Sequence, residues 1–415
     1  MVAYHYPPEG SSSGVQRTLA FSRYLLDHDW TPTVLTAHPR SYTVTRPDQV
    51  ADVPASIAVH RVFALDAARH LALRGRYAGV TSLPDRWISW WLGAVPAGLS
   101  LLRELRPRVI WSTYPIATAH LIGWTLQRVS GLPWVADFRD SMTEDDYPPD
   151  ERQRRVYRWI ERKTIERCTK AVFTTPGALR MYQNRYPEVP REKFAVIANG
   201  YDEESFVSAE ALGPFDVGRT APGQIVLLHS GVLYPSERDP RCFYRALAVL
   251  MKGAALTPSG LRVVLRATGH DEHHRRLIQE NGLEDVVILA PPLPYREALR
   301  EMMDVDGLLV FQAANCNHQT PAKIYEYFRA RRPILALTDP RGDTAAALRE
   351  MGFGAVVPLD DEVRIKEGVL DFLQSIRERR AHVASEEAIR RHSRRARSVE
   401  LARILDEVNA AREKR

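Results

Sequence analysis

Short runs of apolar, largely β-branched residues alternate along this chain with amphipathic segments of helical length. In the first half the apolar runs are Pro32–Thr36, Ile57–Val62, Val109–Ser112, Trp134–Phe138, Ala171–Thr174 and Phe194–Ile197. In the second half they are Ile225–His229, Leu261–Ala267, Val286–Leu289, Leu308–Phe311, Ile334–Leu337 and Ala355–Val357. Strands that alternate with helices form parallel sheets covered by helices, so the pattern predicts an α/β fold.

The two halves are separated by a break in this pattern. Glycine and proline residues interrupt all periodicity between Val207 and Gly223, as expected of a linker. A chain of 415 residues is also too long for one hydrophobic core. We therefore expect two Rossmann-like, doubly wound domains that face each other across a cleft, at residues 1–206 and 224–385, with a linker at 207–223. A C-terminal helix at 386–415 could pack back on the first domain.

Composition is typical of a globular protein from a reducing compartment. Hydrophobic residues make up 45% of the chain and charged residues 26%, which favours a folded over a disordered protein. The three cysteines, Cys168, Cys242 and Cys316, are too widely spaced for a disulfide framework or a zinc motif. The sequence has neither a signal peptide nor a run of 18 apolar residues. We therefore expect a cytoplasmic protein without a transmembrane helix.

The net charge of +6 reflects a cluster of arginines between Arg377 and Arg397. Such a cluster suits nucleic acid, an anionic membrane surface, or solvent alone. No zinc-finger or RRM-type motif accompanies it, so we expect no nucleic-acid partner. A solvated helix face and a peripheral contact with the inner face of the membrane stay open as alternatives.

A glycine-containing loop, Pro7–Gly14, follows the first strand, of which only Val2–Tyr4 precede the loop. We expect the chain to begin within that strand. Glycine allows close backbone approach, and the N-terminus of the following helix offers N–H groups to a phosphate. Ser13 and Gly14 are therefore candidates for binding a phosphate or a transferred sugar, although the segment could also be a plain surface loop.

Charged and polar residues follow two further strands of the first half. Asp137, Arg139 and Asp140 end the strand that begins at Trp134, and Asn199 lies in the turn after Ile197. Ligands bind at the carboxyl ends of parallel strands, so these side chains are candidates for the cleft. The alternative for the first group is an internal ion pair between Arg139 and one of the aspartates.

In the second half, a glycine and an arginine follow the first strand. Gly231 comes directly after the strand, and Arg238 precedes the next helix, an arrangement that suits a diphosphate. Further along, Thr320 fits the N-cap and Pro321 the first position of a helix. Glu326 within that helix can accept both ribose hydroxyls of a nucleotide, unless it only forms a surface pair with Lys323.

Two other patterns could indicate a metal site or a serine hydrolase, but the residues around them favour neither. His270, His273 and His274 have ligand-like spacing without a further ligand set, so a solvated helix start is the better interpretation. The serines of the first loop do not lie in a GxSxG motif, which argues against a serine hydrolase.

Five segments together resemble the retaining glycosyltransferases of family 4, which have the two-domain GT-B fold. The segments are PPEGSSSG, ADFRD, NGYD, SGVLYPSERDP and TPAKIYEYFRARRPILAL, in this order along essentially the whole chain.

The resemblance implies roles for individual residues. The loop through Gly14 would approach the donor phosphate and the acceptor, and Arg238 would hold the diphosphate. Glu326 would bind the ribose, and the turn Thr320–Ala322 would lie beside it. Lys323 would supply a second phosphate-binding charge. His120, after a strand end, resembles the histidine that contacts the donor sugar; a structural histidine in a helix is the alternative.

One position departs from the family pattern. The family usually has an acidic residue eight positions before the ribose-binding glutamate, near the donor sugar. Here that position is His318, which leaves the identity of the sugar open.

The resemblance and the motifs predict a glycosyltransferase that uses a nucleotide-diphosphate sugar. Its acceptor would be a glycan, a glycolipid or a small molecule, and it needs no cofactor. No DxD-type pair occurs in a convincing loop, so we expect no metal, with arginine, lysine and helix N-termini neutralising the leaving diphosphate. The alternatives are a nucleotide-sugar 2-epimerase or hydrolase of the same fold, with Asp137, Asp140 or Glu144 as acid or base, and a non-catalytic nucleotide-sugar-binding subunit.

Overall fold

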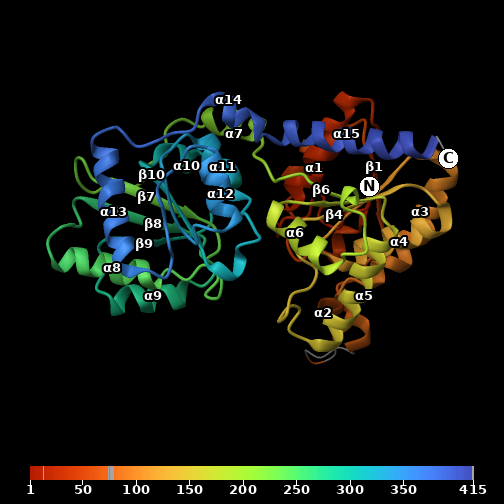
Figure 1. Cartoon of the computed structure of the whole chain (residues 1–415), viewed down its shortest axis with the longest axis horizontal. Coiled ribbons are helices and arrows are strands. Elements are labelled where there is room, and N and C mark those ends of the chain that lie inside the picture. The colour runs from red at the N-terminus through yellow and green to blue at the C-terminus, as the bar shows by residue number, and fades with distance from the viewer. Residues whose placement is uncertain (13, 73, 75–78, 414–415) are drawn as a thin grey trace. The chain divides into compact units, whose positions relative to one another are not determined.

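The computed structural model describes residues 1–12, 14–72, 74 and 79–413 (Figure 1). It divides into two compact units, and each has its own parallel sheet. Unit 1 comprises Met1–Asn199 and Arg394–Arg415, and unit 2 comprises Gly200–Ser393. The predicted α/β class with parallel sheets in two domains is confirmed.

The strands of unit 1 form one continuous parallel arrangement. They are β1 (Thr33–Ala37), β2 (Ala58–Val62), β3 (Ile110–Thr113), β4 (Trp134–Phe138), β5 (Lys170–Phe173) and β6 (Phe194–Val196). β1 pairs with β2, and β3 to β6 pair in sequence order. Val2 bridges Leu35 of β1 and Ser112 of β3, both in parallel. The N-terminal segment thus lies between β1 and β3, where the order of the strands reverses, and such a reversal opens a ligand-binding crevice in doubly wound folds.

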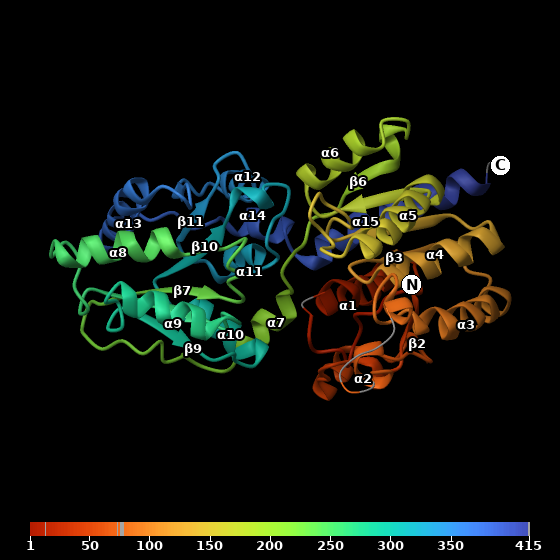
Figure 2. The ribbon, with the colours of Figure 1, turned by 90° about the horizontal axis from the view of Figure 1, so that it is seen from below.

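The helices of unit 1 cover both faces of this sheet. They are α1 (Gly14–Tyr24), α2 (Ala67–His70), α3 (Ser89–Leu105), α4 (Ala117–Ser130), α5 (Glu151–Arg167), α6 (Pro176–Arg185) and α15 (Arg394–Glu413). α3, α4 and α5 pack side by side (Figure 2). On the other face, Phe21 of α1 and Leu401 and Leu405 of α15 share one buried cluster with Val135 of β4. The C-terminal helix is therefore an integral part of unit 1.

Unit 2 has a six-stranded parallel sheet with the order β12-β11-β10-β7-β8-β9. Its strands are β7 (Ile225–Ser230), β8 (Leu261–Arg266), β9 (Val287–Ala290), β10 (Gly307–Gln312), β11 (Ile334–Thr338) and β12 (Val356–Val357). The chain runs outward from β7 to β9, returns to β10 and continues outward on the other side. This is the strand order of a dinucleotide-binding Rossmann fold, and its switch point lies between β7 and β10.

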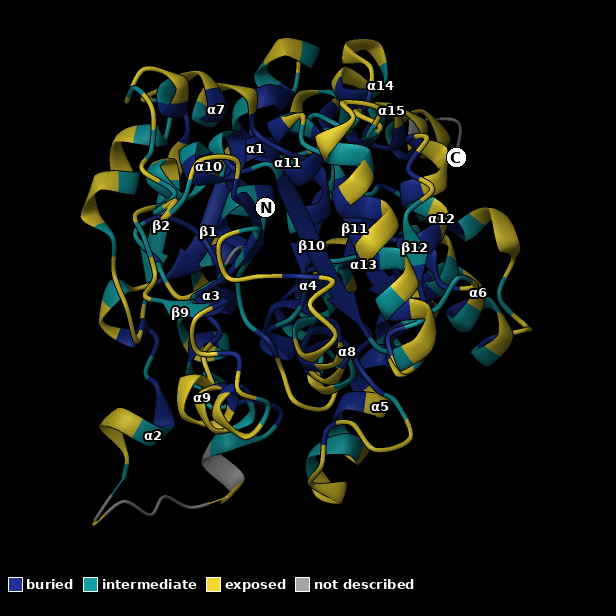
Figure 3. Ribbon diagram, turned by 90° about the vertical axis from the view of Figure 1, so that its left-hand side faces the viewer, coloured by how far each residue is buried: buried dark blue, intermediate teal, exposed yellow. Residues whose placement is uncertain are grey.

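Helices pack on both faces of the unit 2 sheet. They are α7 (Glu203–Glu210), α8 (Arg241–Lys252), α9 (Asp271–Glu280), α10 (Tyr295–Asp304), α11 (Lys323–Ala330), α12 (Asp343–Glu350), α13 (Glu362–Arg377) and α14 (Glu386–Arg391). α8, α9 and α13 lie on one side of the sheet and α10, α11 and α12 on the other (Figure 1). β10 is buried along its whole length, whereas α13 buries only the side that faces the sheet (Figure 3).

The division of the chain differs in detail from the sequence-based boundaries. It falls after Asn199 instead of residue 206. The segment 207–223, expected to be a linker, belongs to unit 2. The Phe215 N–H donates to a carboxylate oxygen of Asp304 at 2.7 Å, and Arg219 pairs with Asp306 at 2.6 Å. Glycine and proline break the helical periodicity here, but these polar contacts fix the segment against α10 and β10.

Candidate functional site

The switch point of unit 2 is where the loops after β7 and β10 meet. The N–H of Ala313, directly after β10, donates to the carbonyl of Glu237 at 2.7 Å. The side-chain amide of Asn315 donates to the carbonyl of Ser236 at 3.2 Å. These bonds join the two loops at the carboxyl edge of the sheet, the edge at which open α/β sheets bind their ligands.

Gly231 allows a lysine to lie directly against this edge. Its φ of +116° is a conformation that residues with a Cβ rarely adopt. A Cβ at this position would also lie only 2.7 Å from Nζ of Lys323. The Lys323 Nζ is 3.1 Å from Nε2 of His229, the penultimate residue of β7. The glycine after the strand thus serves both the backbone conformation and the placement of the ammonium group.

Lys323 lies in an electrostatic environment that disfavours its positive charge. Burial, and then the nearby charge of Arg238, hold the pKa of Lys323 well below its usual value. In the part of the chain that the structure describes, no carboxylate oxygen lies within 4.0 Å of its ammonium group. Two cations therefore share this site without a directly bound acid, which is the electrostatic pattern of an anion-binding site.

Arg238 keeps its guanidinium beside the loop that follows β7. One of its N–H groups donates to the carbonyl of Val232 at 2.9 Å, and the guanidinium carbon lies 5.5 Å from the ring centroid of Tyr234. A guanidinium has five N–H donors, so a single bond to a carbonyl fixes its direction and uses little of its capacity. The site therefore has a second, differently shaped cation for an anionic ligand.

Glu326 is held by a tyrosine that sequence analysis missed. The Tyr295 hydroxyl donates to Oε1 of Glu326 at 2.7 Å. Tyr295 begins α10, after the proline-rich segment 291–294 that follows β9. A tyrosine at a helix start just past a strand is the signal that could have identified it, because that position lies at the ligand-binding edge of the sheet.

The turn before α11 differs from the sequence-based expectation. The helix begins at Lys323 with Ala322 as its N-cap, so the assignment of Thr320 as cap and Pro321 as first helical residue is wrong. The side-chain amide of Gln312, the last residue of β10, donates to the carbonyl of Gln319 at 2.9 Å. This bond holds the start of the turn against the end of the strand. Lys323 therefore lies in the first turn, where the helix dipole adds positive potential.

His318 lies in the same loop, one residue before Gln319. It is partly buried, and its Nε2 is 3.4 Å from the side-chain nitrogen of Gln319. The structure thus brings together on unit 2 the predicted residues Gly231, Arg238, Lys323 and Glu326, and His318 lies in the loop that leads to the turn Thr320–Ala322.

On unit 1, the predicted loop and one strand end meet at Arg139. Its Nη2 is 3.0 Å from Nδ1 of His5, and its Nε donates to the carbonyl of Tyr114 at 2.5 Å. A Cβ at Gly14 would lie 1.8 Å from Nη1 of Arg139, so only glycine leaves room for this guanidinium at the start of α1. Burial, and then the charge of Arg139, hold the pKa of His5 well below its usual value. Ser13 lies outside the described residues.

Asp137 has a structural partner other than the one expected. Both of its carboxylate oxygens accept from Arg17 of α1, at 2.8 and 3.2 Å, and one also accepts from Thr113 at 2.9 Å. Arg17 donates in addition to the carbonyl of Ala198 at 3.0 Å and lies 3.5 Å from Oδ1 of Asn199. Asp137 is fully buried, so this ion pair, and not Arg139, binds it and ties α1 to the sheet. Asp140, by contrast, is exposed.

His120 is buried among aromatic side chains of unit 1. It is 0% exposed, and its ring packs against Phe138 with centroids 4.7 Å apart. Its Nδ1 is 2.8 Å from the hydroxyl oxygen of Ser112. Burial lowers its pKa to about 3, so the ring is neutral. The helical spacing of α4 turns this histidine toward the sheet, and its Nε2 is buried without a hydrogen-bond partner among the described residues.

The other patterns noted in the sequence have local structural partners. His274 is buried, with Nε2 3.2 Å from the carbonyl of Leu233, so it does not belong to a solvated helix start. In the C-terminal arginine cluster, Arg395 pairs with Asp27 at 2.7 Å and Arg397 with Glu400 at 2.6 Å. Among the described residues, no group of three histidine, cysteine or acidic side chains is arranged to hold a metal ion. No described helix has the length and apolar character that spanning a membrane requires.

Comparison with known proteins identifies a family domain in unit 1. Residues 12–200 match the model of the glycosyl transferase 4-like domain. A comparison of the sequence with those of curated proteins found no significant match.

Solved structures resemble the whole chain. Sucrose-phosphate synthase from Thermosynechococcus elongatus has a TM-score of 0.66 at 15% identity, with 99% of each chain covered. HepE from Anabaena, solved with UDP-glucose, has a TM-score of 0.65 at 13% identity, with 98% of this chain and 99% of the other covered. WaaG, a glycosyltransferase of lipopolysaccharide biosynthesis, has a TM-score of 0.62 at 17% identity with the same coverage. Residues 12–200 therefore match a glycosyl transferase 4-like domain, and the whole chain shares the fold of these solved structures.

The contact between Gly231 and Lys323 can be tested through stability. Gly231→Ala should lower the free energy of unfolding by about 1–3 kcal/mol, because it adds backbone strain and displaces the ammonium group from His229. Urea unfolding monitored by circular dichroism measures this loss.

Gly223→Ala is the matched control. Gly223 also has positive φ, +75°, but no atom lies within 4 Å of the added methyl group, so its loss should be smaller. In a Lys323→Ala background, part of the Gly231→Ala loss should disappear. Equal losses in the presence and absence of the lysine side chain would contradict the contact.

Proposed function

We propose that the chain transfers a sugar from a nucleoside-diphosphate sugar to a hydroxyl group of an acceptor, without a metal ion and with retention of configuration. The observation that carries this proposal is the pair of cations at the unit 2 switch point, Lys323 and Arg238, without a directly bound carboxylate. A leaving diphosphate is the anion that such a site, at the start of a helix and beside a glycine, would accommodate.

Each residue of the site would contribute one part of donor binding. Lys323 and Arg238 would neutralise the negative charge that develops on the diphosphate as the bond to the sugar breaks. Glu326, oriented by the Tyr295 hydroxyl, would accept hydrogen bonds from the ribose. His318 would lie near the sugar, because it occupies the position before α11 at which the family has an acidic residue. Retention of configuration rests on the resemblance to family 4.

Unit 1 would bind the acceptor. The Arg139 guanidinium, fixed between His5, Tyr114 and Gly14, lies at the switch point of that sheet. A guanidinium can donate to hydroxyl or anionic groups of a glycan, a glycolipid or a small molecule. Since HepE was solved with UDP-glucose, a uridine-diphosphate sugar is the first donor to test.

The two alternatives make different demands on these residues. A nucleotide-sugar 2-epimerase or hydrolase needs acid and base carboxylates, and Asp137 does not suit this role because Arg17 binds both of its oxygens. Product analysis with the donor alone distinguishes this alternative, since an epimerase needs no acceptor. A non-catalytic subunit would bind the donor without turnover on any acceptor.

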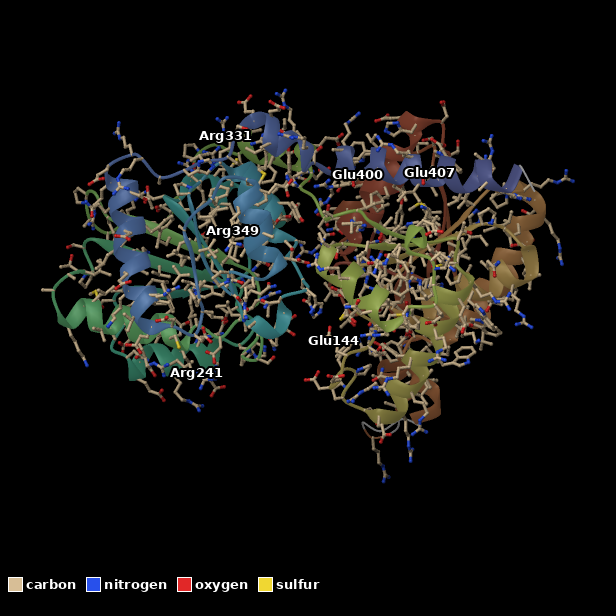
Figure 4. All side chains as sticks on the ribbon, in the orientation of Figure 1. Glu144, Arg241, Arg331, Arg349, Glu400 and Glu407 are labelled. Atoms are coloured by element: carbon tan, nitrogen blue, oxygen red, sulfur yellow. The ribbon has the colours of Figure 1, made fainter. Side chains whose placement is uncertain are left out.

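Substitution of the two charged side chains should weaken donor binding. Arg238→Ala and Glu326→Ala should each raise the dissociation constant of UDP about 10- to 100-fold, because each removes a charged hydrogen-bond partner worth about 1.5–3 kcal/mol. Isothermal titration calorimetry measures the constant. Arg349→Ala and Glu350→Ala are matched controls and should bind UDP normally, because both side chains are exposed on α12. Figure 4 labels Arg349. Unchanged binding in both site variants would contradict the proposed site.

Transfer should not depend on a divalent cation. With a donor and an acceptor in hand, EDTA should change the initial rate by less than about twofold, because protein cations would take over the neutralising role of a metal. A large loss of rate that Mg²⁺ or Mn²⁺ restores would show that the diphosphate site needs a metal.

We also propose a peripheral contact with the inner face of the membrane, made by arginines at the end of α13 and in α14. Arg377, Arg379 and Arg390 are exposed, and each basic side chain near an anionic surface contributes about 1 kcal/mol. The protein should sediment with anionic but not with neutral vesicles, and only at low salt, since salt screens the attraction. Recovery in the supernatant with both vesicle types at both salt concentrations would exclude the contact.

A further inference from the structure

His229 is a buried histidine at the centre of the unit 2 site that neither the sequence motifs nor the proposed chemistry involves. It is the penultimate residue of β7 and is 1% exposed. Its ring packs edge-on against Phe311 of the neighbouring β10, with centroids 5.2 Å apart and planes at 67°. It thus lies at the two strands that form the topological switch point, β7 and β10.

The two ring nitrogens of His229 have different partners. Nδ1 is 2.9 Å from the carbonyl oxygen of Leu309, and Nε2 is 3.1 Å from Nζ of Lys323. A carbonyl oxygen can only accept, so the hydrogen must be on Nδ1. An ammonium group can only donate, so Nε2 must present its lone pair. The neutral ring with hydrogen on Nδ1 satisfies both of these contacts.

We infer that His229 is a positioning residue for phosphate binding: its imidazole, fixed by the Leu309 carbonyl, accepts a hydrogen bond from the Lys323 ammonium and holds it against Gly231, ready for the diphosphate of the donor. The inference rests on the proposed function in that it takes Lys323 as a diphosphate ligand. It adds a residue that would not touch the donor and would act through the lysine.

The surroundings of His229 are consistent with this role. Burial, and then the charge of Lys323, hold its pKa well below the usual value. The charged groups of the site are Lys323 and Glu326 on α11 and Arg238 after β7, and the carbonyls of Leu309 and Gly231 also interact with the ring. With two cations among these groups, a protonated ring would repel the ammonium group it now accepts from.

Fixing the lysine in advance has an energetic consequence for the ligand. A free lysine side chain samples many rotamers, and ordering it during binding costs free energy. Here one of its three N–H bonds already points to Nε2, and the chain is confined beside a glycine that offers no side chain. The remaining N–H groups keep a fixed direction, so less of the binding free energy is lost to ordering.

The test is a double-mutant cycle with UDP as the probe. His229→Phe keeps an aromatic ring of similar size but removes both ring nitrogens, and should raise the dissociation constant about tenfold. Lys323→Met should raise it at least as much. In the Lys323→Met background, His229→Phe should change it less than twofold, because the lysine is then absent. Additive effects, or normal binding by His229→Phe, would overturn the inference.

A conservative variant distinguishes positioning from structural support. His229→Gln can donate to Leu309 and accept from Lys323, so it should restore binding to within about threefold of the unaltered chain. His274→Phe is the matched control, because His274 is an equally buried histidine of unit 2 on α9. It should lower stability, and its effect on UDP binding should be independent of Lys323. Failure of His229→Gln to improve on His229→Phe would contradict the inference.

A spectroscopic measurement on the unaltered chain needs no substitution. The ¹⁵N shifts of the His229 imidazole at neutral pH should show hydrogen on Nδ1 and a lone pair on Nε2, and the opposite tautomer would overturn the inference. This measurement also separates the two hypotheses. If no nucleoside diphosphate binds to the unaltered chain, the proposed function fails, whereas the tautomer still reports on the contact between His229 and Lys323.

Discussion

The placement of a lysine ammonium group at the centre of the unit 2 sheet edge is the constraint on which the site depends. Lys323 lies beside a second cation, Arg238, and its own pKa is depressed by burial. Such an arrangement is costly unless an anion completes it, because charges removed from water need a partner. Gly231 leaves space for the ammonium group, and the neutral ring of His229 offers this group a hydrogen-bond acceptor. The positions of Lys323, Gly231 and His229 therefore depend on one another.

Helix α11 connects this site to the rest of unit 2. Its first turn carries Lys323 and Glu326, while its other end is anchored elsewhere. Arg329 pairs with Glu203 at 2.6 Å and with Glu210 at 2.9 Å, both on α7. Tyr325 and Phe328 pack against the ring of His392, just after α14. A helix of eight residues would be unstable alone, so these contacts and its burial against the sheet hold the first turn in place.

Unit 1 gives different roles to neighbouring charges at one strand end. Asp137 is buried and bound by Arg17, so it stabilises the junction between α1 and β4. Arg139, two residues on, lies against Gly14 at the carboxyl edge of the sheet and donates to the carbonyl of Tyr114. The two residues differ because Asp137 lies within β4, whereas Arg139 follows the last residue of the strand, Phe138, where strand alternation no longer sets the direction of the side chain.

The sequence by itself determined the α/β class and the motifs of the site, because hydrophobic periodicity and glycine placement are local properties. Gly231, Arg238, Lys323 and Glu326 could be named in advance, since each adjoins a strand end or a helix start. Tertiary structure alone decided what long-range packing sets: the burial of His120, and the contacts of Tyr295 with Glu326 and of His229 with Lys323. Residues up to 94 positions apart form these contacts. The strands pair out of sequence order, so the spacing of residues along the chain does not tell which side chains will lie within hydrogen-bond distance.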